Sequence, residues 1–177
     1  MTSATVFGSG GELPDVSVDY LADHRQFIEI LAGWHHETWS YLSPSTTLAQ
    51  RVERLRGNAH KSRIPTTFVA LLAGRPVGCA SLVSSDLSIR QNLSPWLASV
   101  YVEPALRNKG VGSRLVVRAM QEANRLGHND LYLFTPDRQT FYARLGWREI
   151  EKCLYRNYPM SVMQYEFAKL SDLLAPA

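Results

Sequence analysis

The chain has 177 residues, of which 45% are hydrophobic and 20% are charged. These fractions are near globular averages, which excludes overall disorder, and the length suits one domain with a full core. The formal net charge of +3 is too small to indicate a nucleic-acid binder, and no long apolar run predicts a membrane span. Two cysteines, Cys79 and Cys153, are too few for a disulfide framework.

The first residues differ in composition from the rest of the chain. Residues 1–14 include Gly8, Gly10, Gly11 and Pro14, and they predict a flexible N-terminal arm. Residues 15–177 predict a single domain, because neither a repeat nor a long linker interrupts them. The chain starts with neither a basic segment nor an apolar leader segment, so we expect a cytoplasmic protein.

A strand and a helix are expected first. Val16, Val18 and Tyr20 alternate with polar residues, which is typical of a strand. Asp23 and Gln26 have the spacing of a helix capping box. The apolar residues of the helix then repeat at helical spacing: Phe27, Ile30, Leu31 and Trp34.

A second helix is expected between residues 47 and 57. Thr47 and Gln50 again match a capping box, and Gly57 is a typical helix stop. The polar positions of this helix are Arg51, Glu53, Arg54 and Arg56. We interpret them as a solvent-exposed face; contact with a phosphate or an acidic substrate is the alternative.

Three strands and a longer helix should follow. Residues 66–72 and 77–83 are rich in β-forming residues around a Gly-Arg-Pro turn, which predicts a hairpin with Cys79 as a buried apolar residue. Residues 97–102 predict the next strand. Residues 112–126 predict an amphipathic helix, whose apolar stripe is Leu115, Val116, Ala119, Ala123 and Leu126.

The C-terminal part predicts a strand at residues 131–135 and a short helix that ends at Leu145. Thr135 and Pro136 suit the N-cap and the first position of that helix, and Gly146 suits its left-handed stop. Residues 147–155 and 160–167 then predict two more strands.

The segment between residues 102 and 113 has the character of an anion-binding loop. It joins a strand to a helix N-terminus, where the first backbone N–H groups have no partner inside the helix. Gly110 and Gly112 allow a phosphate to approach the backbone, and Arg107 and Lys109 add positive charge. A P-loop and a dinucleotide-binding loop are both excluded, because their lysine and glycine spacings are absent.

Two motifs carry a family resemblance. Arg107-Asn108-Lys109-Gly110-Val111-Gly112 follows a strand and Val-x-Pro, and it resembles the pyrophosphate loop of the GNAT superfamily of acyl-CoA-dependent N-acetyltransferases. Further along, residues 141–147 read Phe-Tyr-Ala-Arg-Leu-Gly-Trp and resemble the family's F-Y-x-x-x-G-[FYW] segment at its usual distance. The resemblance covers residues 66–167 and implies an α/β (α+β) fold, with a mixed, mostly antiparallel central sheet and helices on both faces.

The same resemblance implies acetyl-CoA as the co-substrate. No metal is expected, because the adjacent His35, His36 and Glu37 do not share one face of a helix. The CoA-binding residues would be Val100, Tyr101, Val102, Arg107, Asn108, Lys109, Gly110, Val111, Gly112 and Ser113. Tyr142 aligns with the family's tyrosine general acid, and its phenol is protonated at neutral pH. The family often has an amide residue after the preceding strand, whereas this chain has Thr135-Pro136-Asp137.

The acceptor site is less defined by the sequence. Many relatives have a glutamate on the strand that precedes the loop, but residues 93–102 contain no carboxylate. We assign His36, Glu37, Trp39 and Tyr165 to the acceptor side, and place residues 34–41 between the first two helices. His36 and Glu37 are candidate proton acceptors; Asp86, or a water chain to a backbone carbonyl, is an open alternative.

We therefore expect direct acetyl transfer to a primary amine in a ternary complex, since neither cysteine falls where a nucleophile is expected. The acceptor would be a small-molecule amine or a peptide amine, and the protein a monomer or homodimer that binds neither nucleic acid nor membrane. The alternative from a different class is a non-catalytic acyl-CoA-binding module or sensor with the same fold.

Overall fold

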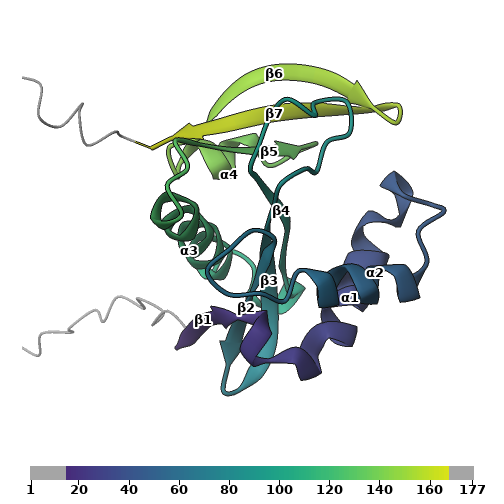
Figure 1. Ribbon diagram of the computed structural model, residues 1–177, viewed down its shortest axis with the longest axis vertical. Coiled ribbons are helices and arrows are strands. Elements are labelled where there is room, and N and C mark those ends of the chain that lie inside the picture. The colour runs from purple at the N-terminus through teal and green to yellow at the C-terminus, as the bar shows by residue number, and fades with distance from the viewer. Residues whose placement is uncertain (1–14, 168–177) are drawn as a thin grey trace, which may run out of the picture.

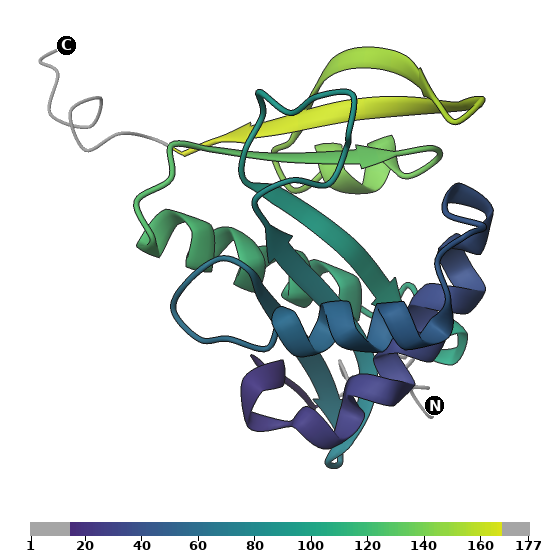
Figure 2. The same cartoon turned by 45° about the vertical axis from the view of Figure 1, so that its right-hand side comes forward.

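The computed structural model describes residues 15–167, which form one seven-stranded sheet in the order β1-β2-β3-β4-β5-β7-β6 (Figure 1). Neighbouring strands are antiparallel except β4 and β5, which are parallel. Helices α1 and α2 cover one face of β2, β3 and β4, and α3 lies behind them on the other face (Figure 2). The predicted fold class is confirmed.

The strands are β1 Val16–Tyr20, β2 Thr66–Leu72, β3 Arg75–Val83, β4 Trp96–Val102, β5 Asp130–Thr135, β6 Arg148–Tyr155 and β7 Tyr158–Glu166. The α-helices are α1 Ile28–Trp39, α2 Leu48–Gly57, α3 Val111–Arg125 and α4 Gln139–Ala143. Short 3-10 helices are η1 Leu21–Asp23, η2 Arg25–Phe27, η3 Ser40–Leu42 and η4 Pro104–Leu106. None of the helices described is long and apolar enough to cross a membrane. The predicted N-terminal arm, residues 1–14, lies outside the described residues.

The start of α1 differs from the sequence prediction. The capping box expected at Asp23 is wrong: η1 and η2 occupy this segment without side-chain caps, and α1 begins at Ile28. Asp23 instead forms an ion pair with Lys61, with 2.6 Å between carboxylate oxygen and amine nitrogen. The helix also runs on to Trp39, so the segment expected to link the two helices belongs mostly to α1.

The N-terminus of α2 matches its prediction, but one side chain does not. Thr47 and Gln50 form the capping box, with reciprocal hydrogen bonds of 2.9 and 3.2 Å. Arg51 was expected to face solvent, yet its residue is only 6% exposed. It lies one helical turn before the buried Leu55 and so shares the inward face of α2.

The sheet separates two apolar cores. On the α3 face, Leu115 and Ala119 pack with Phe68, Leu82 and Leu97 of the sheet. On the other face, Leu31 of α1 and Leu55 of α2 pack with Val69 and Cys79. Cys79 is fully buried, as predicted for a small apolar residue. Both helical layers are thereby fixed against the strands that lead into the candidate site.

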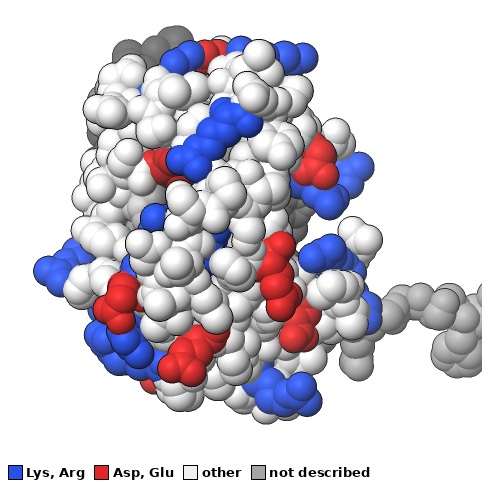
Figure 3. All heavy atoms as spheres, turned by 90° about the vertical axis from the view of Figure 1, so that its right-hand side faces the viewer, with Lys and Arg blue, Asp and Glu red and all other residues white. Residues whose placement is uncertain are grey.

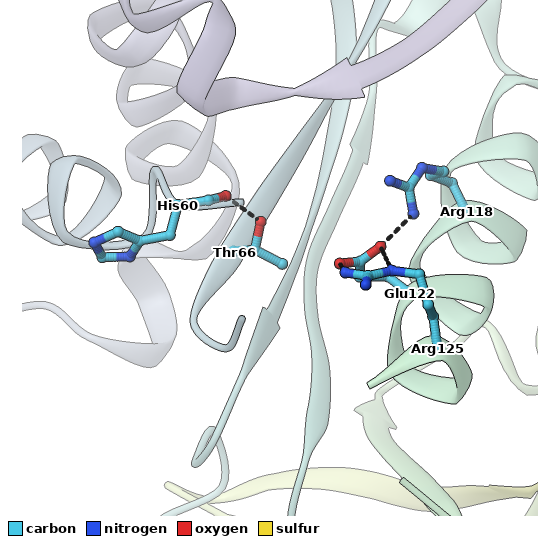
Figure 4. A network of polar contacts seen from close by, with 5 residues as sticks. All are labelled: His60, Thr66, Arg118, Glu122 and Arg125. Atoms are coloured by element: carbon cyan, nitrogen blue, oxygen red, sulfur yellow. Dashed lines mark hydrogen bonds and ion pairs between the residues drawn. The ribbon is translucent and has the colours of Figure 1, made fainter. Parts of the chain in front are cut away.

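A buried carboxylate stabilises the attachment of α3. Glu122 is 1% exposed and accepts hydrogen bonds from Arg118 at 3.0 Å and from Arg125 at 2.5 Å (Figure 4). Burial by itself would raise the pKa of Glu122, but hydrogen bonds from Arg125, Arg118 and Tyr20 outweigh it and lower the pKa to about 2. Arg118 also lies over the rings of Tyr20 and Phe68, which ties α3 to β1 and β2.

Glu122→Gln is expected to destabilise the fold by about 1.5–3 kcal/mol, the range for hydrogen bonds to a charged group. The loss should be smaller than for a fully enclosed pair, because Arg118 and Arg125 both reach solvent. Since the folded pKa is depressed, the stabilisation is present above the unfolded pKa and is lost as the pH falls toward 2. Urea unfolding from neutral to acid pH measures this. The matched control is Glu53→Gln, an exposed pair expected to contribute little.

Candidate active site

Strands β4 and β5 diverge from a single point in the sheet. Trp96 pairs with Tyr132 in parallel register, and the Tyr132 N–H donates to the Pro95 carbonyl at 3.0 Å. In the described sheet this is the single register pair between the two strands. Trp96, Leu97 and Ala98 are buried, but Ser99 and the residues after it are partly exposed. The β5-facing backbone of the second half of β4 is therefore open to a ligand.

A bulge lies where the strands separate. The register between β3 and β4 shifts between Cys79 and Ser81, and Ser99 has a φ of 53°. Left-handed backbone is costly for a serine, so packing around Ser99 must hold it. The bulge re-aims the backbone of Val100, Tyr101 and Val102, the three strand residues that the sequence assigned to CoA.

The predicted anion-binding loop begins where β4 ends. Two of its residues have left-handed backbone, Asn108 with a φ of 60° and Gly110 with a φ of 79°. Gly110 is the N-cap of α3, so the N–H groups of Val111, Gly112 and Ser113 form the first turn. A 15-residue helix thus directs its unpaired N–H groups and positive dipole end toward the opening between β4 and β5.

The side chains of the loop have different surroundings. Arg107 donates from Nε to the Val102 carbonyl at 3.0 Å, which fixes the loop to the end of β4, while Asn108 and Lys109 are exposed. Gly112 differs from expectation, because a Cβ there would lie 3.5 Å from Phe141 and 3.6 Å from Val102. A side chain at Gly112 would point toward protein and not toward a bound phosphate. The close approach of a phosphate to the backbone therefore depends chiefly on Gly110.

Tyr142 lies in α4 on the α3 side of the sheet. Its residue is 8% exposed, and its ring contacts those of Phe141 and Trp147, with centroids 4.9 and 6.0 Å away. Burial raises the pKa of Tyr142 above its usual range, with Arg138 lowering it and Asp137 raising it. The phenol therefore stays protonated at neutral pH, as a proton donor must.

The β5–α4 junction contains an amide side chain, Gln139, to which the sequence assigned no role. Gln139, in the first turn of α4, donates to the Ser161 hydroxyl at 2.9 Å and to the Pro136 carbonyl at 3.3 Å. Thr135 accepts from the Arg138 N–H at 3.1 Å through its hydroxyl. These bonds orient the start of α4.

The four residues assigned to the acceptor do not all come together. His36, Glu37 and Trp39 lie on α1, where Glu37 is exposed and the Nδ1 of His36 is buried without a partner. Tyr165 lies opposite Leu131 of β5, and its ring packs with Trp147 and Phe167, at 5.8 and 5.0 Å. This places Tyr165 in the core beneath α3 and α4, apart from the other three.

A histidine–cysteine contact that was not expected from the sequence lies under α1. His35 Nε2 lies 3.3 Å from the Cys79 sulfur, and that thiol donates to the Ser99 carbonyl at 3.7 Å. Burial lowers the pKa of His35 to about 3 and raises the pKa of Cys79 to about 12. Both groups are neutral at physiological pH, so Cys79 is not a thiolate nucleophile; the pair supports the bulge at Ser99 instead.

Asp86 lies in the loop between β3 and β4, which passes over β5 toward β7 (Figure 2). The next residue, Leu87, is fully buried against Trp96 and Val162, which fixes the loop beside the point where β4 and β5 diverge. Burial raises the pKa of Asp86 to about 6, and the positive charge of Arg54 opposes the shift. Asp86, one of the candidate proton acceptors named from the sequence, thus has a pKa close to neutral pH.

Two contacts join the N-terminal half to the β6–β7 hairpin. Arg156 donates from Nη1 to the Leu42 carbonyl, and the rings of Tyr41 and Tyr158 meet edge to face with centroids 4.8 Å apart. Acidic and basic side chains are interspersed on the face that contains this junction, around a mostly uncharged centre (Figure 3). No cluster of three His, Cys, Asp or Glu side chains suited to a metal occurs among residues 15–167.

Comparisons with known proteins agree with this geometry. Residues 64–149 match the family profile described as the acetyltransferase (GNAT) domain. An uncharacterized N-acetyltransferase of Chlorobaculum tepidum is 31% identical over 85 residues, which are 48% of this chain and 51% of that protein. The match thus spans about half the length of this curated relative.

Solved structures share the fold. An acyl-CoA N-acyltransferase from Pseudomonas aeruginosa superposes with a TM-score of 0.60 and 23% identity, over 85% of this chain and 97% of that one. An aminoglycoside 6'-N-acetyltransferase complexed with coenzyme A gives a TM-score of 0.67 and 17% identity, over 85% and 96% of the two chains. At these identities the similarity establishes the architecture alone.

Proposed function

We propose that this chain, a member of the GNAT acetyltransferase family through its residues 64–149, transfers the acetyl group of acetyl-CoA to a primary amine by direct attack in a ternary complex. The divergence of β4 from β5, with the α3 N-terminus at its open end, carries this proposal. The pyrophosphate would lie on the N–H groups of residues 111–113, and the pantetheine arm along residues 100–102.

The side chains near this opening suit the bond changes of acetyl transfer. The amine nitrogen attacks the thioester carbon, and a backbone N–H of β4 near Val102 stabilises the oxygen's developing negative charge. The carbon–sulfur bond then breaks, and the leaving thiolate takes the phenolic proton of Tyr142. The amine proton must pass to a base before or during attack.

We assign the role of base to Asp86. Its pKa of about 6 leaves it ionised at neutral pH while keeping it a stronger base than an ordinary carboxylate. Glu37 is exposed, and its charge acts on Tyr101. Tyr101 lies near the end of β4, where the CoA arm would pass. His36 and Glu37 remain the competing assignment.

The finer points of the function stay predictions. The relatives named above include an aminoglycoside acetyltransferase, which agrees with a small amine as the acceptor here. An acetyl group as the acyl group, a cytoplasmic location and a monomeric or homodimeric state are expected from the sequence. A non-catalytic CoA-binding module is the alternative that an activity measurement separates.

CoA is expected to stabilise the wild-type protein by about 2.7 kcal/mol at a hundredfold excess over its dissociation constant. Gly110→Ala should abolish most of this stabilisation, because a side chain disfavours the left-handed backbone that directs the α3 N–H groups. Thermal unfolding with and without CoA measures the difference.

Gly74→Ala is the matched control for this measurement. Gly74 has nearly the same backbone angle, a φ of 74°, but lies in the β2–β3 turn with nothing within 4 Å of an added Cβ. Both variants should lose a similar amount of intrinsic stability. If Gly110→Ala keeps the full CoA-induced shift, the pyrophosphate loop is assigned wrongly.

A further inference from the structure

Arg51 occupies an unusual position for a guanidinium group. Its residue is 6% exposed, and its Nε and Nη2 are buried without a hydrogen-bond partner among the described residues. Buried donors are almost always paired, and a buried charge without a partner is costly. Two strong donors are therefore held in place without an acceptor from residues 15–167.

A series of interactions connects Arg51 with the opening between β4 and β5. The positive charge of Arg51 acts on His35, the buried histidine of α1. His35 contacts the Cys79 sulfur, and the Cys79 thiol donates to the Ser99 carbonyl at the bulge. Arg51 thus lies on the α1–α2 side of the open part of β4, the side on which His36, Glu37 and Trp39 also lie.

The charges around Arg51 leave this region positive. Arg54 lies one turn along α2 and is close enough to Arg51 to act on its charge. The positive charge of Arg54 also acts on Asp86, the residue assigned to proton transfer. Arg54 is thus near enough to act on both Arg51 and the carboxylate of Asp86, so an amine that also carries an anionic group would offset the second positive charge.

We propose that the acceptor is an amine that bears an anionic group, a carboxylate or a phosphate, and that Arg51 and Arg54 bind this group while the amine faces Asp86. The inference rests on the proposed acetyl transfer and narrows its substrate class. A guanidinium offers parallel N–H donors that match the oxygens of either anion. The same charges disfavour a polycationic acceptor. Because the Arg51 donors are enclosed in this structure, binding requires the side chain to turn toward the ligand.

The first experiment compares matched acceptors by amine-dependent thiol release from acetyl-CoA. L-Amino acids are paired with their carboxamides, and phosphoethanolamine is paired with ethanolamine, so each pair differs in the anionic group. The anionic member should have the higher kcat/KM, by about 10- to 150-fold, the range for a hydrogen-bonded charge. The two kinds of pair distinguish a carboxylate from a phosphate.

The second experiment uses Arg51→Met, which keeps the length of the side chain and removes its charge. This variant should lower kcat/KM for the anionic amine to near that of its neutral partner. Its melting temperature should equal or exceed that of wild type, since an unpaired buried charge is removed. Arg56→Met is the matched control, because Arg56 lies on the same helix but is exposed and paired with Glu53.

The outcomes separate this inference from the proposed function. Acetylation of the neutral members alone, or of both members of each pair with equal kcat/KM, contradicts an anionic acceptor. An equal loss of activity by Arg51→Met toward both members of a pair contradicts it as well. A large fall in the melting temperature of Arg51→Met, beyond that of Arg56→Met, would make Arg51 a structural residue. Failure of the proposed function appears differently, as absence of CoA-induced stabilisation in the wild-type protein.

Discussion

Tyr142→Phe is expected to lower kcat by about 10²- to 10⁴-fold, the usual contribution of a positioned proton donor. The substitution removes the phenolic oxygen and keeps the ring that packs between Phe141 and Trp147. Affinity for CoA should therefore stay near that of wild type. Single-turnover kinetics with saturating acetyl-CoA measures the chemical step, and a thermal shift with CoA checks binding.

Tyr20→Phe serves as the control for Tyr142→Phe. The Tyr20 hydroxyl hydrogen-bonds with Glu122 in the network that joins α3 to β1, so its loss should affect stability rather than turnover. Unchanged turnover by Tyr142→Phe in an assay limited by chemistry would assign Tyr142 to packing, and the proton for the thiolate would then come from elsewhere.

Asp86→Asn is expected to lower kcat/KM for the acceptor amine by about 10²- to 10⁴-fold, since it removes the proposed base. Wild-type activity should fall as the pH drops through about 6, because a protonated carboxyl cannot accept the amine proton. The variant should lose this dependence. A pH profile of kcat/KM from acid to neutral pH, with acetyl-CoA saturating, tests both effects.

The competing bases are tested in the same series. Glu37→Gln and His36→Ala should each lower kcat/KM for the acceptor amine less than Asp86→Asn does. Glu53→Gln, on the exposed face of α2, is the control for the loss of a surface carboxylate. If Asp86→Asn retains the wild-type pH profile while Glu37→Gln or His36→Ala removes it, the base belongs to α1.

Much of this architecture could be predicted from local sequence patterns. Thr47 and Gln50 specify the start of α2 through a reciprocal cap, and Gly146 occupies the left-handed position that its sequence context indicates. Such signals act within a few residues of the chain, so they survive folding unchanged. The loop motif was accessible for the same reason, whereas the cap expected at Thr135 is wrong, because α4 begins at Gln139 with Arg138 as its N-cap.

The acceptor side depended on contacts between distant segments. Asp86 acquires its raised pKa only when the β3–β4 loop folds over Trp96 and brings it near Arg54. Tyr165 was assigned to the acceptor side, but strand alternation directs its ring under α4. Arg51 could have been recognised, because it precedes Leu55 by one helical turn; its charge suggested a solvent-exposed face instead.

The most direct test uses isotopically labelled acetyl-CoA and follows the label in the presence and absence of an acceptor amine. We expect the label to stay on CoA without an amine, and to move to the amine with one thiol released for each amide formed. Label on the protein before an amine is added would contradict direct transfer and indicate an acyl-enzyme. CoA binding without thiol release, with every amine of the matched pairs, would contradict the enzyme and support a non-catalytic CoA-binding module.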